Sequence, residues 1–388
     1  MSRSDNPDHY FQTSDSLATA ERRASKSKNK HGEPIELKAK ILAVLADDQH
    51  GVFVAGADGL VRQVDLDSRE AAPLQPGANA PLTSLALGTS SDGQPLLFAG
   101  CWDKSIRSWN LATRKSWKRY AAGHTDFVKC VVFAKLQDQP IIITGGADAK
   151  IIVWNVDTGA RLHTLTGHSR GVLTLAIDVL PPLSATGYDT IDLFSADSVN
   201  MIRKWRITND SAIQSSTTPI VAHETSVNKL HFDSLGSDED DDADLWTASA
   251  DKTTKHLVRS REWEADTTLE HPDYVKDVLV AGAQGQLVVT ACRDEEIRVW
   301  NASTGTLVCI YSGHYDEVTS LAAVQGGMKL ISASLDGTVR QWSLDLQDMQ
   351  KVMEERQKAE DEAPVEAKKE GVMTAEEEAE LAELMDSD

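Results

Sequence analysis

Short runs in which apolar and polar residues alternate recur through the middle of the chain. Between residues 128 and 166 four such runs follow one another: VKCVVFA, PIIITGG, IIVWNV and ARLHTLT. Alternation with a period of two predicts β-strands, and the Gly, Asp and Asn residues between the runs are typical of turns. The pattern therefore predicts units of four short strands.

A polar phrase accompanies these units. It consists of a His, an alternating apolar run, Ser/Thr-x-x-x-Asp, and a Trp six residues after the Asp. Three copies are complete: His124, Thr144, Asp148 and Trp154; His271, Thr290, Asp294 and Trp300; His314, Ser332, Asp336 and Trp342. With His168 and His223, which begin further copies, the five histidines are spaced by 44, 55, 48 and 43 residues. This period is typical of repeat architectures.

The phrase resembles the WD40 repeat, and the resemblance covers about residues 38–344. It implies an all-β, seven-bladed WD40-like β-propeller, in which each blade is a four-stranded antiparallel sheet. It also implies that the four polar residues of a blade form a hydrogen-bonded tetrad. This is chemically reasonable, because Asp accepts hydrogen bonds and a buried indole needs an acceptor.

Seven blades are expected, and three depart from the phrase. Blade 1 has Val64 where Trp is expected, blade 4 has Val199 in place of the Asp with Asp197 two residues early, and blade 5 has Leu257 in place of Trp. Blade 7 ends after its third strand at Leu344. We predict that residues 34–38 (PIELK) complete it, since ring closure removes exposed sheet edges.

Charge divides the chain into three parts. The net charge is −21, of which residues 345–388 carry −11 and the run 237–244 (SDEDDDAD) carries −6. Acidic blocks repel themselves and bury little surface, so both are expected to be solvated or disordered. We expect a disordered segment at 1–32, a propeller at 33–346 and an acidic tail with short helices at 347–388. Residues 346–361 are expected to be one of these helices.

The N-terminal segment contains a basic cluster and no apolar run. The cluster, a candidate nuclear import signal, consists of Arg22, Arg23, Lys26, Lys28 and Lys30. No secretory leader or membrane span is expected, and the four cysteines show no C-x-x-C pair, so an intracellular protein is predicted. Ser25 follows Arg22-Arg23-Ala24, and Ser237 precedes acids, so each resembles a kinase site.

Catalysis is not expected. Ser, His and Asp recur in unit after unit, whereas a nucleophilic triad occurs once and lines a pocket. The chain contains no phosphate-binding loop, dinucleotide fingerprint, H-E-x-x-H or G-x-S-x-G motif, and the other histidines lack metal-ligand spacing. We predict a protein that is not an enzyme and takes no cofactor or metal.

Propellers bind partners mainly on the face formed by the loops before the first strand and between the second and third strands. Register with the phrase places a set of aromatic, basic and polar residues on this top face: Trp102, Phe127, Lys129, Asn228, Tyr274, Lys276 and Arg293. Aromatic residues and Arg carry much of the energy of interfaces. The set favours a peptide ligand with acidic and apolar side chains. Alternatively, these are common surface lysines and rings that pack on loops.

The acidic segments suggest further surfaces. The run 237–244 lies on the opposite face and either binds a basic client or is a solvated insertion. In the tail, Thr374 to Glu377 form a capping-box pattern before an acidic helix. Its Leu381, Leu384 and Met385 are candidate anchors for a partner's groove; a merely solubilising tail is the alternative.

The resulting hypothesis is a non-catalytic interaction scaffold within a multiprotein complex, a monomer that is at least partly nuclear and binds neither membrane nor nucleic acid directly. Three alternatives stay open: a chaperone-like escort of a basic client such as a histone or ribosomal protein, an auxiliary subunit of an RNA-modifying enzyme, and a ubiquitin-ligase substrate receptor. The W-D-x-R motif linked with such receptors is absent.

Overall fold

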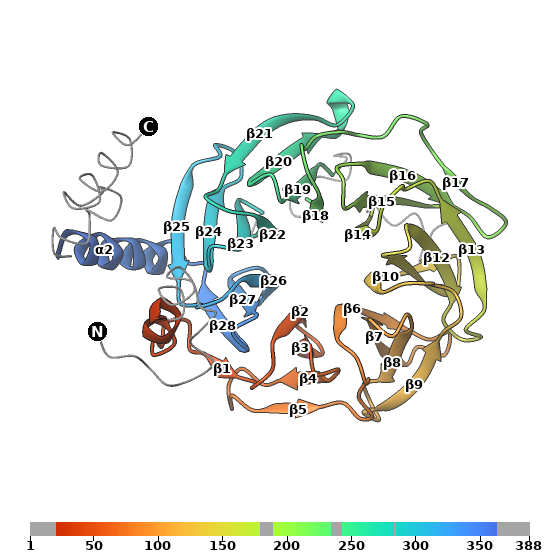
Figure 1. Ribbon diagram of the computed structural model, residues 1–388, viewed down its shortest axis with the longest axis horizontal. Coiled ribbons are helices and arrows are strands. Elements are labelled where there is room, and N and C mark those ends of the chain that lie inside the picture. The colour runs from red at the N-terminus through yellow and green to blue at the C-terminus, as the bar shows by residue number, and fades with distance from the viewer. Residues whose placement is uncertain (1–20, 179–188, 234–242, 283–284, 363–388) are drawn as a thin grey trace, which may run out of the picture. The chain divides into compact units, whose positions relative to one another are not determined.

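The computed structural model describes residues 21–178, 189–233, 243–282 and 285–362. The chain divides into two units, Met1–Asp345 and Leu346–Asp388. The first contains seven four-stranded antiparallel sheets arranged as a ring (Figure 1), which confirms the predicted seven-bladed propeller. The second begins with the helix α2 (Leu346–Glu362), where a helix is expected.

The first four blades follow the repeat order, with strands numbered from the axis outward. Blade 1 contains β2 (Ile41–Asp47), β3 (Gly51–Gly56), β4 (Val61–Val64) and β5 (Ala71–Pro73). Blade 2 contains β6 (Leu82–Thr89), β7 (Pro95–Cys101), β8 (Ile106–Asn110) and β9 (Lys115–Tyr120). Blade 3 contains β10 (Val128–Leu136), β11 (Gln139–Gly146), β12 (Lys150–Asn155) and β13 (Arg161–Thr166). Blade 4 contains β14 (Val172–Ile177), β15 (Ile191–Asp197), β16 (Ile202–Ile207) and β17 (Ala212–Gln214).

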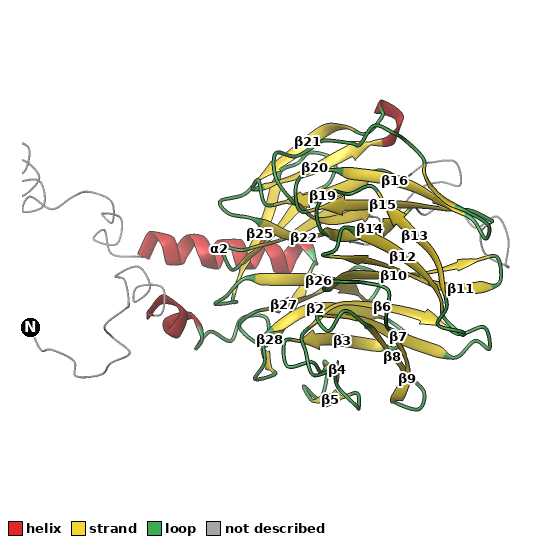
Figure 2. Cartoon of the chain, turned by 45° about the vertical axis from the view of Figure 1, so that its right-hand side comes forward, coloured by secondary structure: helices red, strands yellow, loops and turns green. Residues whose placement is uncertain are grey.

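Blades 5 and 6 follow the same order, whereas blade 7 takes its outer strand from the N-terminal segment. Blade 5 contains β18 (Val227–Phe232), β19 (Leu245–Ser249), β20 (Thr253–Val258) and β21 (Glu264–Glu270), with the 3-10 turn η2 (Arg259–Arg261) before β21. Blade 6 contains β22 (Val275–Ala281), β23 (Leu287–Cys292), β24 (Glu296–Asn301) and β25 (Leu307–Ser312). Blade 7 contains β26 (Val318–Val324), β27 (Lys329–Ser334), β28 (Thr338–Ser343) and β1 (Ile35–Glu36). Strands dominate the propeller (Figure 2).

An N-terminal strand closes the ring. β1 pairs antiparallel with β28, with Ile35 opposite Val339. The contact continues before the strand, since the Gln341 amide donates to the Gly32 carbonyl at 2.8 Å. Gly32 has a φ of +66°, and a Cβ there would lie 2.7 Å from the Trp342 ring, so only glycine fits without displacement.

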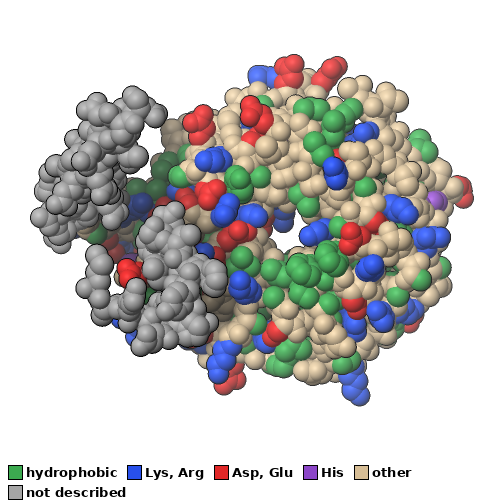
Figure 3. Space-filling view, viewed as in Figure 1, with side chains coloured by type: hydrophobic (Ala, Val, Ile, Leu, Met, Phe, Trp, Pro, Cys, Tyr) green, Lys and Arg blue, Asp and Glu red, His purple; other side chains and the backbone are tan. Residues whose placement is uncertain are grey.

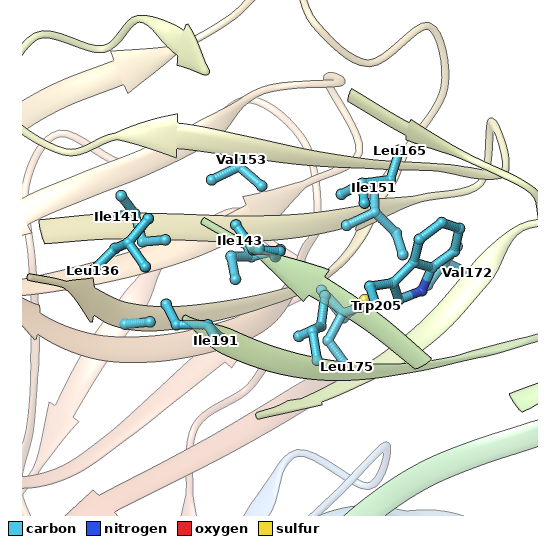
Figure 4. Packing of buried hydrophobic residues seen from close by; sticks show 14 residues of the cluster. Leu136, Ile141, Ile143, Ile151, Val153, Leu165, Val172, Leu175, Ile191 and Trp205 are labelled. Carbon is cyan, nitrogen blue, oxygen red and sulfur yellow. The ribbon is translucent and has the colours of Figure 1, made fainter. Parts of the chain in front are cut away.

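The core lies between neighbouring blades, because each sheet buries both of its faces. Between blades 3 and 4, for example, Ile143 and Ile151 from one sheet pack with Val172, Leu175 and Trp205 from the next (Figure 4). All five side chains are buried. This packing holds each blade's loops in a fixed position relative to those of its neighbours.

Every innermost strand carries a β-bulge at its second residue. The register against the second strand shifts there in all seven blades. The bulged residues are Leu42, Thr83, Lys129, Leu173, Asn228, Lys276 and Thr319. A bulge interrupts the alternation of side chains between the two faces of a strand and changes the direction of a side chain. The direction of the side chain at these positions therefore cannot be read from simple alternation.

Part of the N-terminal segment that we expected to be disordered is ordered. Residues 21–26 are helical, and their basic side chains form ion pairs with the propeller, including Arg22 with Glu295 at 2.8 Å. These pairs join positions far apart in the sequence, which is why the composition of residues 1–32 alone did not indicate them. Residues 1–20 lie outside the described residues.

Candidate functional site

The tetrads of blades 3 and 7 form directional chains of hydrogen bonds. In blade 7 His314 Nδ1 lies 2.8 Å from Asp336 Oδ2, and its Nε2 lies 2.7 Å from Ser332 Oγ. A carboxylate only accepts, so Nδ1 carries the proton and Nε2 accepts from the serine hydroxyl. That oxygen accepts in turn from Trp342 Nε1 at 2.9 Å. Burial lowers the pKa of His314, consistent with a neutral ring.

Blade 3 repeats this arrangement through the same four residue types. His124 lies 3.0 Å from Asp148 and 2.9 Å from Thr144, whose hydroxyl also accepts from the Trp154 indole at 3.0 Å. Burial lowers the pKa of His124 as well. In both blades this series of hydrogen bonds connects the loop before the first strand to the second and third strands. The polar atoms that a hydrolytic triad would need are therefore already hydrogen-bonded to one another.

Blade 4 has a complete tetrad although Val199 occupies the expected Asp position. Asp197, two residues earlier, reaches His168 Nδ1 at 2.9 Å. Ser195 Oγ lies 2.6 Å from His168 Nε2 and accepts from the Trp205 indole at 2.7 Å. The carboxylate comes from the end of β15 instead of the turn after it. The hydrogen-bonded tetrad is therefore retained in blade 4 although the sequence departs from the phrase there.

Blade 6 requires a correction, because Asp294 does not bind its histidine. His271 Nε2 contacts Thr290 at 2.9 Å and Trp300 donates to the same hydroxyl at 3.0 Å, but Nδ1 lies 3.2 Å from the Leu269 carbonyl. A carbonyl, like a carboxylate, only accepts, so the same tautomer is retained without an acid. Burial, followed by the nearby Arg298, lowers the pKa of His271 to about 4.

The displaced aspartate pairs with an arginine four residues later. Asp294 contacts Arg298 at 2.7 Å, and Asp103 contacts Arg107 at 2.8 Å in blade 2. Asp58 pairs with Arg62 at the same spacing in blade 1. In these three blades, an Arg four residues after the turn aspartate indicates that the aspartate pairs with this Arg and not with a histidine. It is not sufficient, because Asp336 pairs with His314 although Arg340 follows it by four residues.

Three of the predicted top-face residues meet at blades 2 and 3. The Trp102 and Phe127 rings stack with centroids 4.9 Å apart and planes 14° apart. Lys129 Nζ lies 5.9 Å from the centroid of each ring. Trp102 is 39% exposed, and the described contacts of the Lys129 ammonium are with these two rings. An exposed indole stacked on a half-buried phenyl ring, with an ammonium beside both, suits an acidic and apolar ligand.

The residues on blade 6 differ, because their charges already have partners. Arg293 lies 5.2 Å from the Tyr274 ring and 3.9 Å from Asp273. Lys276 forms an ion pair with Glu317 of blade 7 at 2.9 Å. Tyr274 remains 38% exposed. This part of the face therefore offers an aromatic surface with a nearly balanced charge, and it is separate from the cluster formed by Trp102, Phe127 and Lys129.

Asn228 does not contribute a free amide to the face. Its Nδ2 donates to the Val275 carbonyl of blade 6 at 2.7 Å. Thr83 and Thr319, at the same bulge position, donate to the next blade's Val128 and Ile41 carbonyls at 2.6 and 3.0 Å. The position thus links neighbouring blades when a short polar side chain occupies it. The lysines at this position make other contacts: Lys276 pairs with Glu317 of the next blade, and Lys129 lies over the Trp102 and Phe127 rings.

An acidic pair on blades 6 and 7 has no signal in the sequence pattern. Glu295, in the turn between β23 and β24, and Asp316, before β26, bind Arg22, Arg23 and Lys26 of the N-terminal segment. No spacing rule relates these positions, because they meet only after the ring has formed. Within the described residues no group of three or more His, Cys, Asp or Glu side chains is arranged to hold a metal ion.

The comparisons with known proteins agree with this architecture. A family model described as "WD domain, G-beta repeat" matches residues 74–110, 117–155 and 305–343. An uncharacterised WD repeat-containing protein of Schizosaccharomyces pombe is 35% identical over 393 aligned residues, which cover 99% of each chain. This chain belongs to the WD-repeat family. The resemblance inferred from the repeated phrase is therefore confirmed.

Other WD-repeat relatives match shorter parts of the chain. Pre-mRNA-processing factor 19 of Mus musculus is 28% identical over 165 residues, 42% of this chain and 28% of that protein. Polycomb group protein FIE1 of Oryza sativa is 24% identical over 170 residues, 42% of this chain and 45% of that protein. WD-repeat propellers are typically scaffolds that bind other proteins, and generally lack catalytic activity.

Several predicted features of this WD-repeat chain lie outside the described residues. They include most of the acidic run 237–244 and the tail anchors Leu381, Leu384 and Met385. Asp244, at the end of the run, is described, and its carboxylate accepts from the Arg259 amide at 2.7 Å. No helix in the described part of the chain is long and apolar enough to cross a membrane.

Proposed function

We propose that this chain is a non-catalytic interaction scaffold in a multiprotein complex, and that blades 2 and 3 form its principal binding surface. The observation that carries the proposal is the stack of Trp102 on Phe127 with Lys129 beside both rings. Stacked rings are rigid, so a partner that covers them orders few new side chains. Figure 3 shows hydrophobic and basic side chains gathered beside the central opening on one face of the ring.

The proposed ligand is a peptide with apolar and acidic side chains. An apolar side chain would cover the exposed Trp102 ring, and a carboxylate would pair with Lys129. The ammonium already lies over two aromatic faces, which keeps it in place without neutralising it. The chain's net charge of −21 makes non-specific attraction to an acidic partner weak, so recognition depends on this local site.

The test is quantitative affinity purification from the native cell, read by mass spectrometry. Lys129→Glu and Trp102→Ala are each compared with wild type, and Lys115→Glu serves as the matched control. Lys115 is exposed on β9, the outer strand of blade 2, and carries the same charge change away from the face. We expect the same few proteins to be lost with both top-face variants and retained with Lys115→Glu.

The result distinguishes the surface on blades 2 and 3 from the two acidic segments as the binding site. Circular dichroism must show that all three variants stay folded. If the recovered proteins are unchanged in Lys129→Glu and Trp102→Ala, the proposed surface is wrong, and the acidic run 237–244 and the tail 347–388 are tested next by deletion. Loss of a salt-sensitive basic partner in those deletions would instead favour the escort function.

We also propose that the protein acts as a monomer within this complex and is at least partly nuclear. Two kinds of relative carry names that refer to Polycomb group and pre-mRNA-processing proteins, and the chain has a basic cluster at residues 22–30. Fluorescence microscopy of the tagged full chain tests the location. Exclusion of the tagged protein from the nucleus under all growth conditions would contradict it.

A further inference from the structure

Glu295 is buried at a turn position where the lysines of two other blades are exposed. It follows the turn aspartate of blade 6, as Lys104 does in blade 2 and Lys252 in blade 5, and all three have a φ near +70° (76°, 68° and 72°). Lys104 and Lys252 are exposed, whereas the Glu295 side chain is 3% exposed. The positive φ belongs to the turn; the burial of Glu295 comes from the N-terminal segment that lies against it.

Three cations of this segment hold it on blades 6 and 7. Arg22 and Lys26 each contact one Glu295 oxygen, at 2.8 and 2.7 Å, and Arg23 contacts Asp316 at 2.9 Å. A buried carboxylate without a partner is costly, so Glu295 couples its own burial to the presence of these cations. Ser25 lies within the same helical turn, and it is exposed.

The segment has a fixed part and a releasable part. From His31 onward it is held by blade 7: the Arg340 guanidinium donates to the His31 carbonyl, and the Gln341 backbone N–H donates to the Gly32 carbonyl. Residues 21–28 depend instead on the ion pairs with Glu295 and Asp316. Because residues 21–26 contact the propeller through these ion pairs, this part leaves the surface when the pairs break.

We propose that Ser25 is a phosphorylation site and that its modification releases residues 21–28 from blades 6 and 7. The sequence Arg22-Arg23-Ala24-Ser25 presents two guanidinium groups just before the hydroxyl, as base-directed protein kinases require. Ser25 Oγ attacks the γ-phosphorus of ATP held by the kinase. A new O–P bond forms, the bond to the β-γ bridging oxygen breaks, ADP leaves, and the hydroxyl proton passes to the kinase's catalytic base.

The charge count explains the release. Three cations face two carboxylates in the docked segment. A phosphate adds about −1.5 to −2 charge, which turns this excess of positive charge into an excess of negative charge. Ser25 and Arg22 are also neighbours on one helix face, three residues apart, so the phosphate competes with Glu295 for Arg22. Release exposes both the acidic pair and the cations of the basic cluster.

Docking and phosphorylation must then compete. A kinase binds its substrate in an extended form, so it modifies the undocked segment, and the propeller slows the reaction by holding the docked one. Glu295→Gln keeps the shape of the side chain and removes its charge. Charge-assisted hydrogen bonds contribute enough that this variant should raise the rate of Ser25 phosphorylation by about tenfold.

The experiment treats the full chain with a base-directed protein kinase and ATP. Mass spectrometry locates the phosphate, and hydrogen exchange compares residues 21–28 with residues 29–36. We expect phosphate on Ser25, loss of amide protection in 21–28, and unchanged protection in 29–36. Ser25→Ala should block both the modification and the loss of protection. Glu295→Gln should lose protection in 21–28 without any kinase.

Three results would overturn the proposal. They are absence of phosphate on Ser25 in both wild type and Glu295→Gln, retained protection of 21–28 in the fully phosphorylated protein, and an equal phosphorylation rate in wild type and Glu295→Gln. None of these measurements involves the surface formed by Trp102, Phe127 and Lys129. A negative result would therefore overturn the Ser25 proposal without affecting the proposed binding function.

Discussion

Ile35 lies opposite Val339 in the ladder that closes the ring, so blade 7 is built from both ends of the propeller. Ile35 and Leu37 are buried in the cluster that also contains Val339 and Ile331. The closing strand thus contributes apolar contacts in addition to backbone hydrogen bonds. Without it, β28 would become an edge strand.

Deleting residues 1–37 should therefore open the ring, whereas deleting residues 1–28 should not. The longer deletion removes two buried side chains, each worth about 1.5–3 kcal/mol, and exposes the β28 edge. We expect a lower free energy of unfolding and concentration-dependent association, measured by denaturant unfolding and light scattering. The shorter deletion retains Gly32 and β1 and serves as the control. Similar behaviour of the two proteins would show that β1 does not close the ring.

Ser195 supports two buried side chains, whereas its counterpart in blade 5, Thr247, supports one. Ser195→Ala leaves His168 Nε2 and the Trp205 indole unsatisfied. Thr247→Val affects His223 in a blade whose tetrad has Leu257 in place of Trp. At about 1–3 kcal/mol for each unsatisfied group, Ser195→Ala should cost roughly twice as much. Urea unfolding of both variants measures this, and equal costs would contradict the directional chain.

Stability should fall on mild acidification because of the buried histidines. The pKa of His271 is lowered to about 4, below its ordinary value near 6.5. Below pH 6.5 the unfolded chain therefore binds a proton that the folded chain does not, and the free energy of unfolding decreases until about pH 4. The loss is at most about 3 kcal/mol for this one residue.

His271→Gln should remove this contribution and flatten the profile between pH 6.5 and pH 4. The variant is less stable at neutral pH, so the relevant quantity is the slope of unfolding free energy against pH. Thr247→Val provides a control that is also destabilised but retains His271. A slope in His271→Gln as steep as in the control would show that this histidine does not titrate as described.

The sequence predicts what is local and misses what depends on the closed ring. Blade number and tetrad residues follow from the repeated phrase, because their partners lie within one blade. Asp294 was assigned to the histidine, but Arg298 lies on the adjacent strand and offers a full charge. Asn228 was placed on the face, yet a bulge turns it to the next blade. The pairing of Glu295 with Lys26 spans 269 positions and has no sequence period at all.

A buried ion pair between blades 4 and 5 provides a last test of how charge is used in this ring. Asp178, whose side chain is 1% exposed, is held by Arg259, with Nη1 at 2.9 Å from Oδ2. The guanidinium also lies 4.8 Å from the Trp263 ring. Lys204 lies farther from Asp178, at 3.9 Å, and closer to Asp192, at 3.2 Å, so it compensates the Asp178 charge less well than Arg259 does. Removing Arg259 therefore leaves a buried carboxylate poorly compensated.

Arg259→Met should cost about 3–5 kcal/mol of unfolding free energy, whereas Arg206→Met should cost less than about 1 kcal/mol. Arg206 also pairs with an aspartate, Asp192, at 2.8 Å, but the Arg206 side chain is 52% exposed. Asp192, which is buried, keeps Lys204 as a partner at 3.2 Å when Arg206 is removed. Asp178→Asn added to Arg259→Met should recover part of the loss by removing the stranded charge. Urea unfolding of the four proteins measures this, and no recovery in the double variant would assign the cost to lost packing on Trp263 instead.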